Sequence, residues 1–209
     1  MARCIYGSLF DTHQFYATFM YIACWLGCTM CKRFIFAIIV LLFFGQTSVA
    51  QNADDYLDRL ERAESALKAE FLVMQIWDAW TFPQETRAQH AVMRIGMEAM
   101  NANALDQAER IFTKILSATP DYTEAWNKRA TVRFMKGDFV GSEADIYQVL
   151  IREPRHFGAL AGLGMINMRL RDYEKALNAY ERVKSINPFS TDANAIIPDL
   201  KDMLGIVDL

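Results

Sequence analysis

Three prolines recur at a constant interval, and this interval constrains the fold more than any other feature of the chain. Pro120, Pro154 and Pro188 are spaced by 34 residues each time. A fixed period of this length is typical of chains built from repeated supersecondary units. Working back from each proline gives three gapless units, which span residues 89–122, 123–156 and 157–190.

Within each unit, two positions always hold a small residue and one always holds a larger side chain. The eighth and twentieth positions are small and the twenty-fourth is large. Small side chains let two helix axes approach closely, and the large one fills the space beside them. The proline ends the second helix, because it lacks an N–H donor and disfavours helical backbone before it. We therefore predict two antiparallel helices per unit, crossing at these residues: Gly96, Ala130, Gly164, Ala108, Ser142, Ala176, Phe112, Ile146 and Tyr180.

This pattern resembles the tetratricopeptide repeat family, in which a Leu-Gly pair, a later Ala-x-x-x-Phe and a closing Pro recur. Two units depart from it. The middle unit has Arg129 and Ala130 at the Leu-Gly pair, and the first lacks the Gly137-Asp138 turn of the second. The resemblance implies an all-α fold, a right-handed superhelical solenoid of three helix pairs with N- and C-terminal capping helices. It also implies a protein-binding scaffold and no enzyme.

The capping helices are expected on either side of the repeats. Residues 51–88 form the expected N-terminal helical cap, since apolar residues recur every three or four positions from Ala53 to Trp80. Residues 191–209 form the expected C-terminal cap, broken or kinked at Pro198. The stretches 76–80 and 153–160 resemble exported tetratricopeptide proteins of Gram-negative, particularly alphaproteobacterial, type.

Residues 30–50 have the three parts of a secretory signal peptide. Lys32-Arg33 precedes the uncharged run 34–45, and the segment ends in Ser48-Val49-Ala50, which has the small residues of a cleavage site. We predict cleavage between Ala50 and Gln51 and export to the periplasm. The alternative is an uncleaved anchor that holds the repeats outside the cytoplasm and is the chain's only membrane contact. Residues 1–29 are an untranslated or apolar extension, or half of a membrane hairpin.

Composition argues against several functions for the part after Ala50. Acidic residues outnumber basic ones there, so no nucleic-acid partner is expected. All four cysteines precede Ala50, which leaves no disulfide or thiol chemistry. His90 and His156 lack metal-ligand spacing and are interpreted as polar surface or junction residues, and Asp145 and Glu153 as solvated. We expect no catalytic residue, metal or cofactor.

In the family that this chain resembles, the first helix of each unit lines a concave face that binds a partner polypeptide. Here that face is rich in methionine, which suits irregular apolar partners. The basic positions that grip acidic chaperone C-termini in some members hold mostly Met or Gly, so that ligand is not expected. Two alternatives remain: residues 53–80 or the C-terminal helix cover this face, or the chain self-associates without a separate ligand. The predicted binding residues are Met93, Arg94, Met97, Met100, Asn127, Lys128, Thr131, Phe134, Met135, Met165, Met168 and Arg169.

Overall fold

A computed structural model describes residues 53–206, and every regular element in this part of the chain is a helix. Residues 1–52 and 207–209 lie outside the described part, and with them the predicted signal peptide and the cleavage site at Ala50 and Gln51. No described helix is long and apolar enough to cross a bilayer. The elements in chain order are α3 (Ala53–Glu61), α4 (Ala66–Thr81), the 3₁₀ helix η1 (Gln84–Gln89), α5 (His90–Asn101), α6 (Leu105–Ala118), α7 (Thr123–Met135), α8 (Phe139–Arg152), α9 (Phe157–Leu170), α10 (Tyr173–Ile186) and α11 (Thr191–Leu204).

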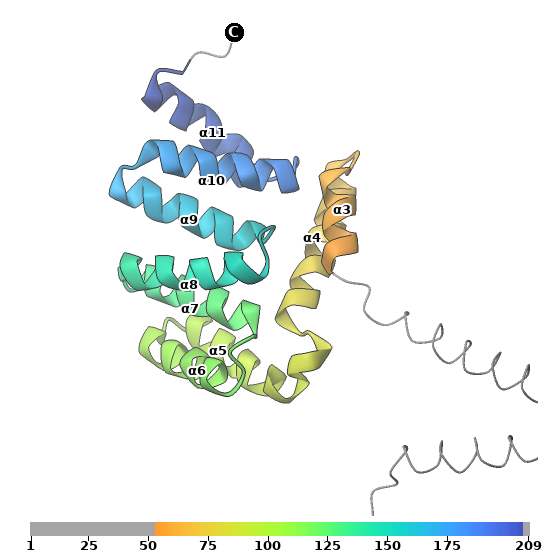
Figure 1. The fold of residues 1–209 in the computed structure, drawn as a ribbon, viewed down its shortest axis with the longest axis vertical. Coiled ribbons are helices and arrows are strands. Elements are labelled where there is room, and N and C mark those ends of the chain that lie inside the picture. The colour runs from red at the N-terminus through yellow and green to blue at the C-terminus, as the bar shows by residue number, and fades with distance from the viewer. Residues whose placement is uncertain (1–52, 207–209) are drawn as a thin grey trace, which may run out of the picture. The chain divides into compact units, whose positions relative to one another are not determined.

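Six of these helices form three antiparallel pairs, one in each 34-residue unit. The pairs α5–α6, α7–α8 and α9–α10 stack side by side, and α11 covers the last of them (Figure 1). The predicted all-α solenoid of three helix pairs with additional helices at both ends is confirmed. Pro198 does not break α11, however, because the helix continues through this exposed proline to Leu204.

The small residues lie where the helices of a pair cross, as predicted. A Cβ added to Gly164 would stand 2.6 Å from the ring of Tyr180, and one added to Gly96 would stand 2.7 Å from Phe112. Both distances are too short for a side chain of any size. The large residue at position twenty-four therefore fills the space that the glycine leaves free.

The turn between paired helices explains the Gly-Asp sequence. Gly137 has a φ of 81°, a conformation that costs glycine little. Asp138 then accepts a hydrogen bond from the Gly141 N–H and caps α8. In the first unit Asn103 takes the positive φ, and no side chain caps α6 at Ala104. The first unit thus keeps the turn geometry and loses the cap.

The N-terminal helices do not simply extend the stack ahead of the first repeat. Helix α4 contacts α7, and α3 contacts α10, so this segment runs beside the repeats toward the C-terminal end (Figure 1). Arg155 fixes it by ion pairs to three carboxylates of α3, with N–O distances of 2.8, 2.6 and 3.3 Å to Asp54, Asp58 and Glu61. The apolar face of this segment is buried in one cluster with the third repeat and α11: Leu57, Leu60, Leu72, Ile76, Trp80, Phe157, Leu160, Tyr180 and Leu200.

Candidate binding face

Two tryptophans of α4 lie over the first turn of α9. The rings of Trp80 and His156 are stacked, with centroids 4.0 Å apart and an interplanar angle of 12°. Trp77 meets Phe157 edge to face at 5.3 Å, and its indole occupies the space that a side chain on Gly158 would need. The glycine and the aromatic pair therefore fit one another, and α4 covers this end of the concave face.

His156 lies at the centre of this contact and is fully buried. The Ala159 N–H donates to its Nδ1 at 3.1 Å, so Nδ1 accepts and caps α9. The proton is then on Nε2, which donates to the Glu124 carboxylate at 3.0 Å. The interpretation of His156 as a junction residue agrees with this position, but the expected polar surface location is wrong, because α4 seals the site.

Glu124 is a second fully buried polar group beneath α4. Lys128 Nζ lies 2.9 Å from its carboxylate, and Asn127 Nδ2 donates to both of its oxygens at 3.1 Å. Burial by itself raises the pKa of Glu124, but the hydrogen bond from His156 and the nearby charge of Lys128 outweigh burial and lower it. The carboxylate is therefore held in its charged form within a complete set of partners.

The C-terminal end of α4 is fixed by Tyr122, which is also buried. Its hydroxyl donates a hydrogen bond to the Thr81 carbonyl. Burial raises the pKa of Tyr122 to about 12. Together with the tryptophan contacts, this bond sets where α4 leaves the repeats and η1 begins.

Three predicted binding residues do not lie on an open surface. Met93 is 0% exposed and belongs to the core of the first repeat, so its assignment to the groove is wrong. Asn127 is buried on Glu124, and Lys128 lies between Glu124 and the face of Trp77, 5.2 Å from the ring centroid. Asn127 and Lys128 lie on α7, which α4 contacts, whereas Met93 lies on α5 and is buried by the core of the first repeat.

The later positions of α5, α7 and α9 remain accessible. Met135 and Met165 are 48% and 44% exposed. Arg94, at the rim, stacks on Phe82 with its guanidinium carbon 5.3 Å from the ring centroid. The other predicted residues are exposed or half-buried, and the half-buried ones also pack against the cores of the repeats: Met97, Met100, Phe134 and Met168. We call the whole set the open half of the concave face; it comprises Met97, Met100, Thr131, Phe134, Met135, Met165, Met168 and Arg169.

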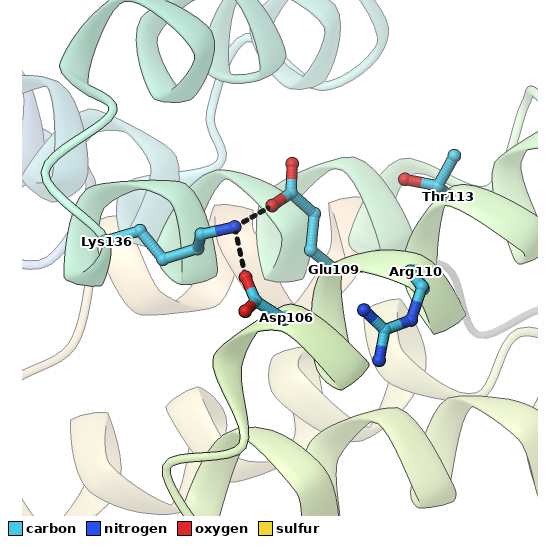
Figure 2. Close-up of a pocket in the computed structure, with 5 residues that line it drawn as sticks. All are labelled: Asp106, Glu109, Arg110, Thr113 and Lys136. Carbon is cyan, nitrogen blue, oxygen red and sulfur yellow. Dashed lines mark hydrogen bonds and ion pairs between the residues drawn. The ribbon is translucent and has the colours of Figure 1, made fainter.

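A network of charges joins the first two repeats away from α4. Arg129, at the position where the family has Leu, places two nitrogens 2.8 Å from the carboxylate of buried Asp145. Arg133 links Asp145 to Glu109. Figure 2 shows the next part of the network, in which Lys136 lies between Asp106 and Glu109, 2.7 Å from each carboxylate. The expectation that Asp145 is solvated is therefore wrong. Arg129, which departs from the family pattern, is thus compensated by Asp145, sixteen residues later in the sequence.

The helix pairs and the half-covered concave face define a helical-repeat scaffold. Models of the tetratricopeptide repeat match residues 93–154 and 157–190. A TPR repeat-containing protein of Rhizobium etli is 30% identical over 159 residues, which is 76% of this chain and 78% of the relative. The chain belongs to the tetratricopeptide repeat family.

Solved structures show the same fold at low sequence identity. The first TPR of Spaghetti (RPAP3), bound to an HSP90 peptide, is 22% identical with a TM-score of 0.53 over 55% of this chain and 91% of its own. The Sgt2 TPR domain of Aspergillus fumigatus is 21% identical, with a TM-score of 0.53 over 57% and 80%. A MamA structure is 16% identical, with a TM-score of 0.53 over 74% and 83%.

Proposed function

We propose that this chain is an exported scaffold that holds a partner polypeptide in the open half of its concave face, in the assembly or maintenance of the cell envelope. The observation that carries the proposal is that methionines recur at the same two positions of the first and third repeats. The ninth and twelfth positions hold Met97 and Met100 in the first repeat and Met165 and Met168 in the third. Flexible thioethers at repeated positions suit an apolar segment laid across the repeats.

The family supports a polypeptide ligand, because one solved neighbour is described as bound to an HSP90 peptide. We do not propose an acidic peptide, such as the chaperone C-termini that some members of the family bind, as the ligand. Among the positions that grip acidic chaperone C-termini in other members of the family, only the one at Lys128 is basic here, and Lys128 is already paired with Glu124. An apolar partner fits the open half better.

The test is crosslinking and capture from the native envelope with matched double variants. Met135→Ser with Met165→Ser removes the two most exposed methionines of the open half. Capture should fall at least tenfold, because a few apolar contacts usually carry most of an interface's binding energy. Val140→Ser with Ile151→Ser, at 82% and 72% exposed positions of α8, is the control and should leave capture unchanged. Equal capture by both variants contradicts the proposed site.

A second candidate function is self-association through α8. Val140, Tyr147 and Ile151 are 82%, 52% and 72% exposed and recur at helical spacing, so they form an apolar stripe on one face. Sedimentation equilibrium of the protein and of its Val140→Ser, Ile151→Ser variant tests this function. A dimer that the variant abolishes supports it, and a monomer at all concentrations rejects it.

A further inference from the structure

A cleft separate from the open half lies between α4, α9, α10 and the start of α11. Its volume is about 590 Å³, which is within the range of sites that enclose organic groups. Val73 and Trp77 line it from α4, Ala161 from α9 and Val183 from α10. The cleft thus offers an apolar wall on several sides.

Tyr180 also lines this cleft and is 2% exposed. Its hydroxyl makes no hydrogen bond to any residue in the described part of the chain, although buried tyrosine hydroxyls usually find a partner. The hydroxyl oxygen is not sealed from solvent, since no buried side-chain oxygen among residues 53–206 lacks a partner. Because Tyr180 lines the cleft, a group that enters the cleft lies beside this side chain.

Two carboxylates lie at the same cleft. Glu70 comes from α4 and Asp192 from the first turn of α11. Neither forms an ion pair within residues 53–206, and no Lys or Arg lines the cleft. An apolar wall, two unpaired carboxylates and an unused hydroxyl together complement a cation carried on an apolar stem.

We propose that this cleft binds the side chain of an arginine that the partner polypeptide inserts, a proposal that rests on the proposed polypeptide-binding function. The aliphatic stem lies against Val73 and Trp77, and the guanidinium lies between Glu70 and Asp192. Its planar fork of five donors can bond both carboxylates and the Tyr180 oxygen at once, whereas an ammonium group cannot present the same geometry. The open half then receives the apolar flank of the partner, and the cleft selects its charged residue.

The experiment titrates Nα-acetyl-arginine methylamide into the full-length protein and follows the indole N–H resonances by NMR. The Trp77 resonance should shift in a saturable way. Nα-acetyl-norleucine methylamide, which has a comparable stem without charge, should give no such shift. The corresponding lysine probe should bind at least threefold more weakly, and equal binding overturns the choice of arginine.

Variants locate the site. Glu70→Gln with Asp192→Asn should lower the affinity for the arginine probe at least tenfold, and Tyr180→Phe about threefold, both with unchanged melting. Glu181→Gln with Asp199→Asn, at exposed positions outside the cleft, is the matched control and should change nothing. Loss of affinity in the control variant alone, or no saturable shift in the unmodified protein, overturns the inference.

Capture from the envelope separates this inference from the function on which it rests. If the protein captures a polypeptide but its Trp77 resonance does not shift with the arginine probe, only the assignment of the cleft is overturned. If the arginine probe shifts the Trp77 resonance but no polypeptide is captured from the envelope, then the arginine does not come from a polypeptide, and the proposed function is overturned as well. Capture that the Glu70→Gln, Asp192→Asn variant weakens at least tenfold supports both.

Discussion

The indole of Trp80 lies flat on the imidazole of His156, although 76 positions separate them in the sequence. His156 accepts from the Ala159 N–H and donates to Glu124, so one histidine caps α9, satisfies a buried carboxylate and provides the surface on which α4 packs. This contact decides which half of the concave face is covered.

Removing the Trp80 ring should release α4 from the repeats. We expect Trp80→Ala to lower the free energy of unfolding by about 3–5 kcal/mol, as for other truncations of buried aromatic residues. Phe71→Ala, at a 54% exposed position of the same helix, should stay within about 0.5 kcal/mol. Urea melts of both variants measure the difference, and similar midpoints would mean that α4 does not pack on the repeats in solution.

Arg129 and Asp145 should behave as a coupled pair. Arg129→Leu restores the residue typical of the family but leaves the Asp145 charge buried with one partner fewer. It should cost about 3–5 kcal/mol, as when one member of a buried ion pair is removed. Adding Asp145→Leu should recover part of that loss. A double-mutant cycle by chemical denaturation checks this, and additive effects of the two substitutions would contradict the coupling.

Gly164 should not tolerate a side chain. Gly164→Leu would force the Tyr180 ring out of its place, and overpacking of this kind costs about 1–3 kcal/mol or more. Lys175→Ala on the adjacent helix removes an exposed ion pair with Asp172, and it should leave the denaturant midpoint almost unchanged because such surface pairs contribute little. Denaturant midpoints compare the two, and a Gly164→Leu variant as stable as the control would refute the close crossing.

Glu124 should make the fold sensitive to acid. Its pKa is lowered in the folded protein, so its contribution to stability is present above the unfolded pKa of about 4.3 and is lost as the pH falls through the folded value. The difference in unfolding free energy between the native protein and Glu124→Gln should be about 1–3 kcal/mol at pH 7 and should shrink below about pH 4. Urea melts between these pH values measure it, and a constant difference would show that Glu124 does not titrate as inferred.

The N-terminus of the native protein should be Gln51. The positively charged start, short apolar run and small residues before Ala50 favour cleavage there after export. N-terminal sequencing of protein isolated from its own envelope checks this. A chain that retains residues 34–45 would instead be anchored, and its repeats would work at the membrane surface.

The sequence alone was sufficient to predict the repeat architecture. Two features were enough: the spacing of the prolines and the small residues at helix crossings. Both depend on residues no more than 34 positions apart, and each has a direct physical reason, because proline ends a helix and small side chains let two helices approach. Gly164 against Tyr180 is an example, because a period that repeats gaplessly leaves one way to pair the two helices. The accessible methionines of the open half follow from the same periodicity.

Only the tertiary structure decided what covers the concave face. The amphipathic pattern of α4 predicts that one of its faces is buried. Many surfaces could bury that face, and no feature of the local sequence selects the third repeat. The selection depends on the fit of Trp77 to the space above Gly158 and of Trp80 to His156, between residues about 80 positions apart. For the same reason Met93, His156 and Asp145 were misplaced, since burial of a single side chain depends on packing across the whole stack and not on its period.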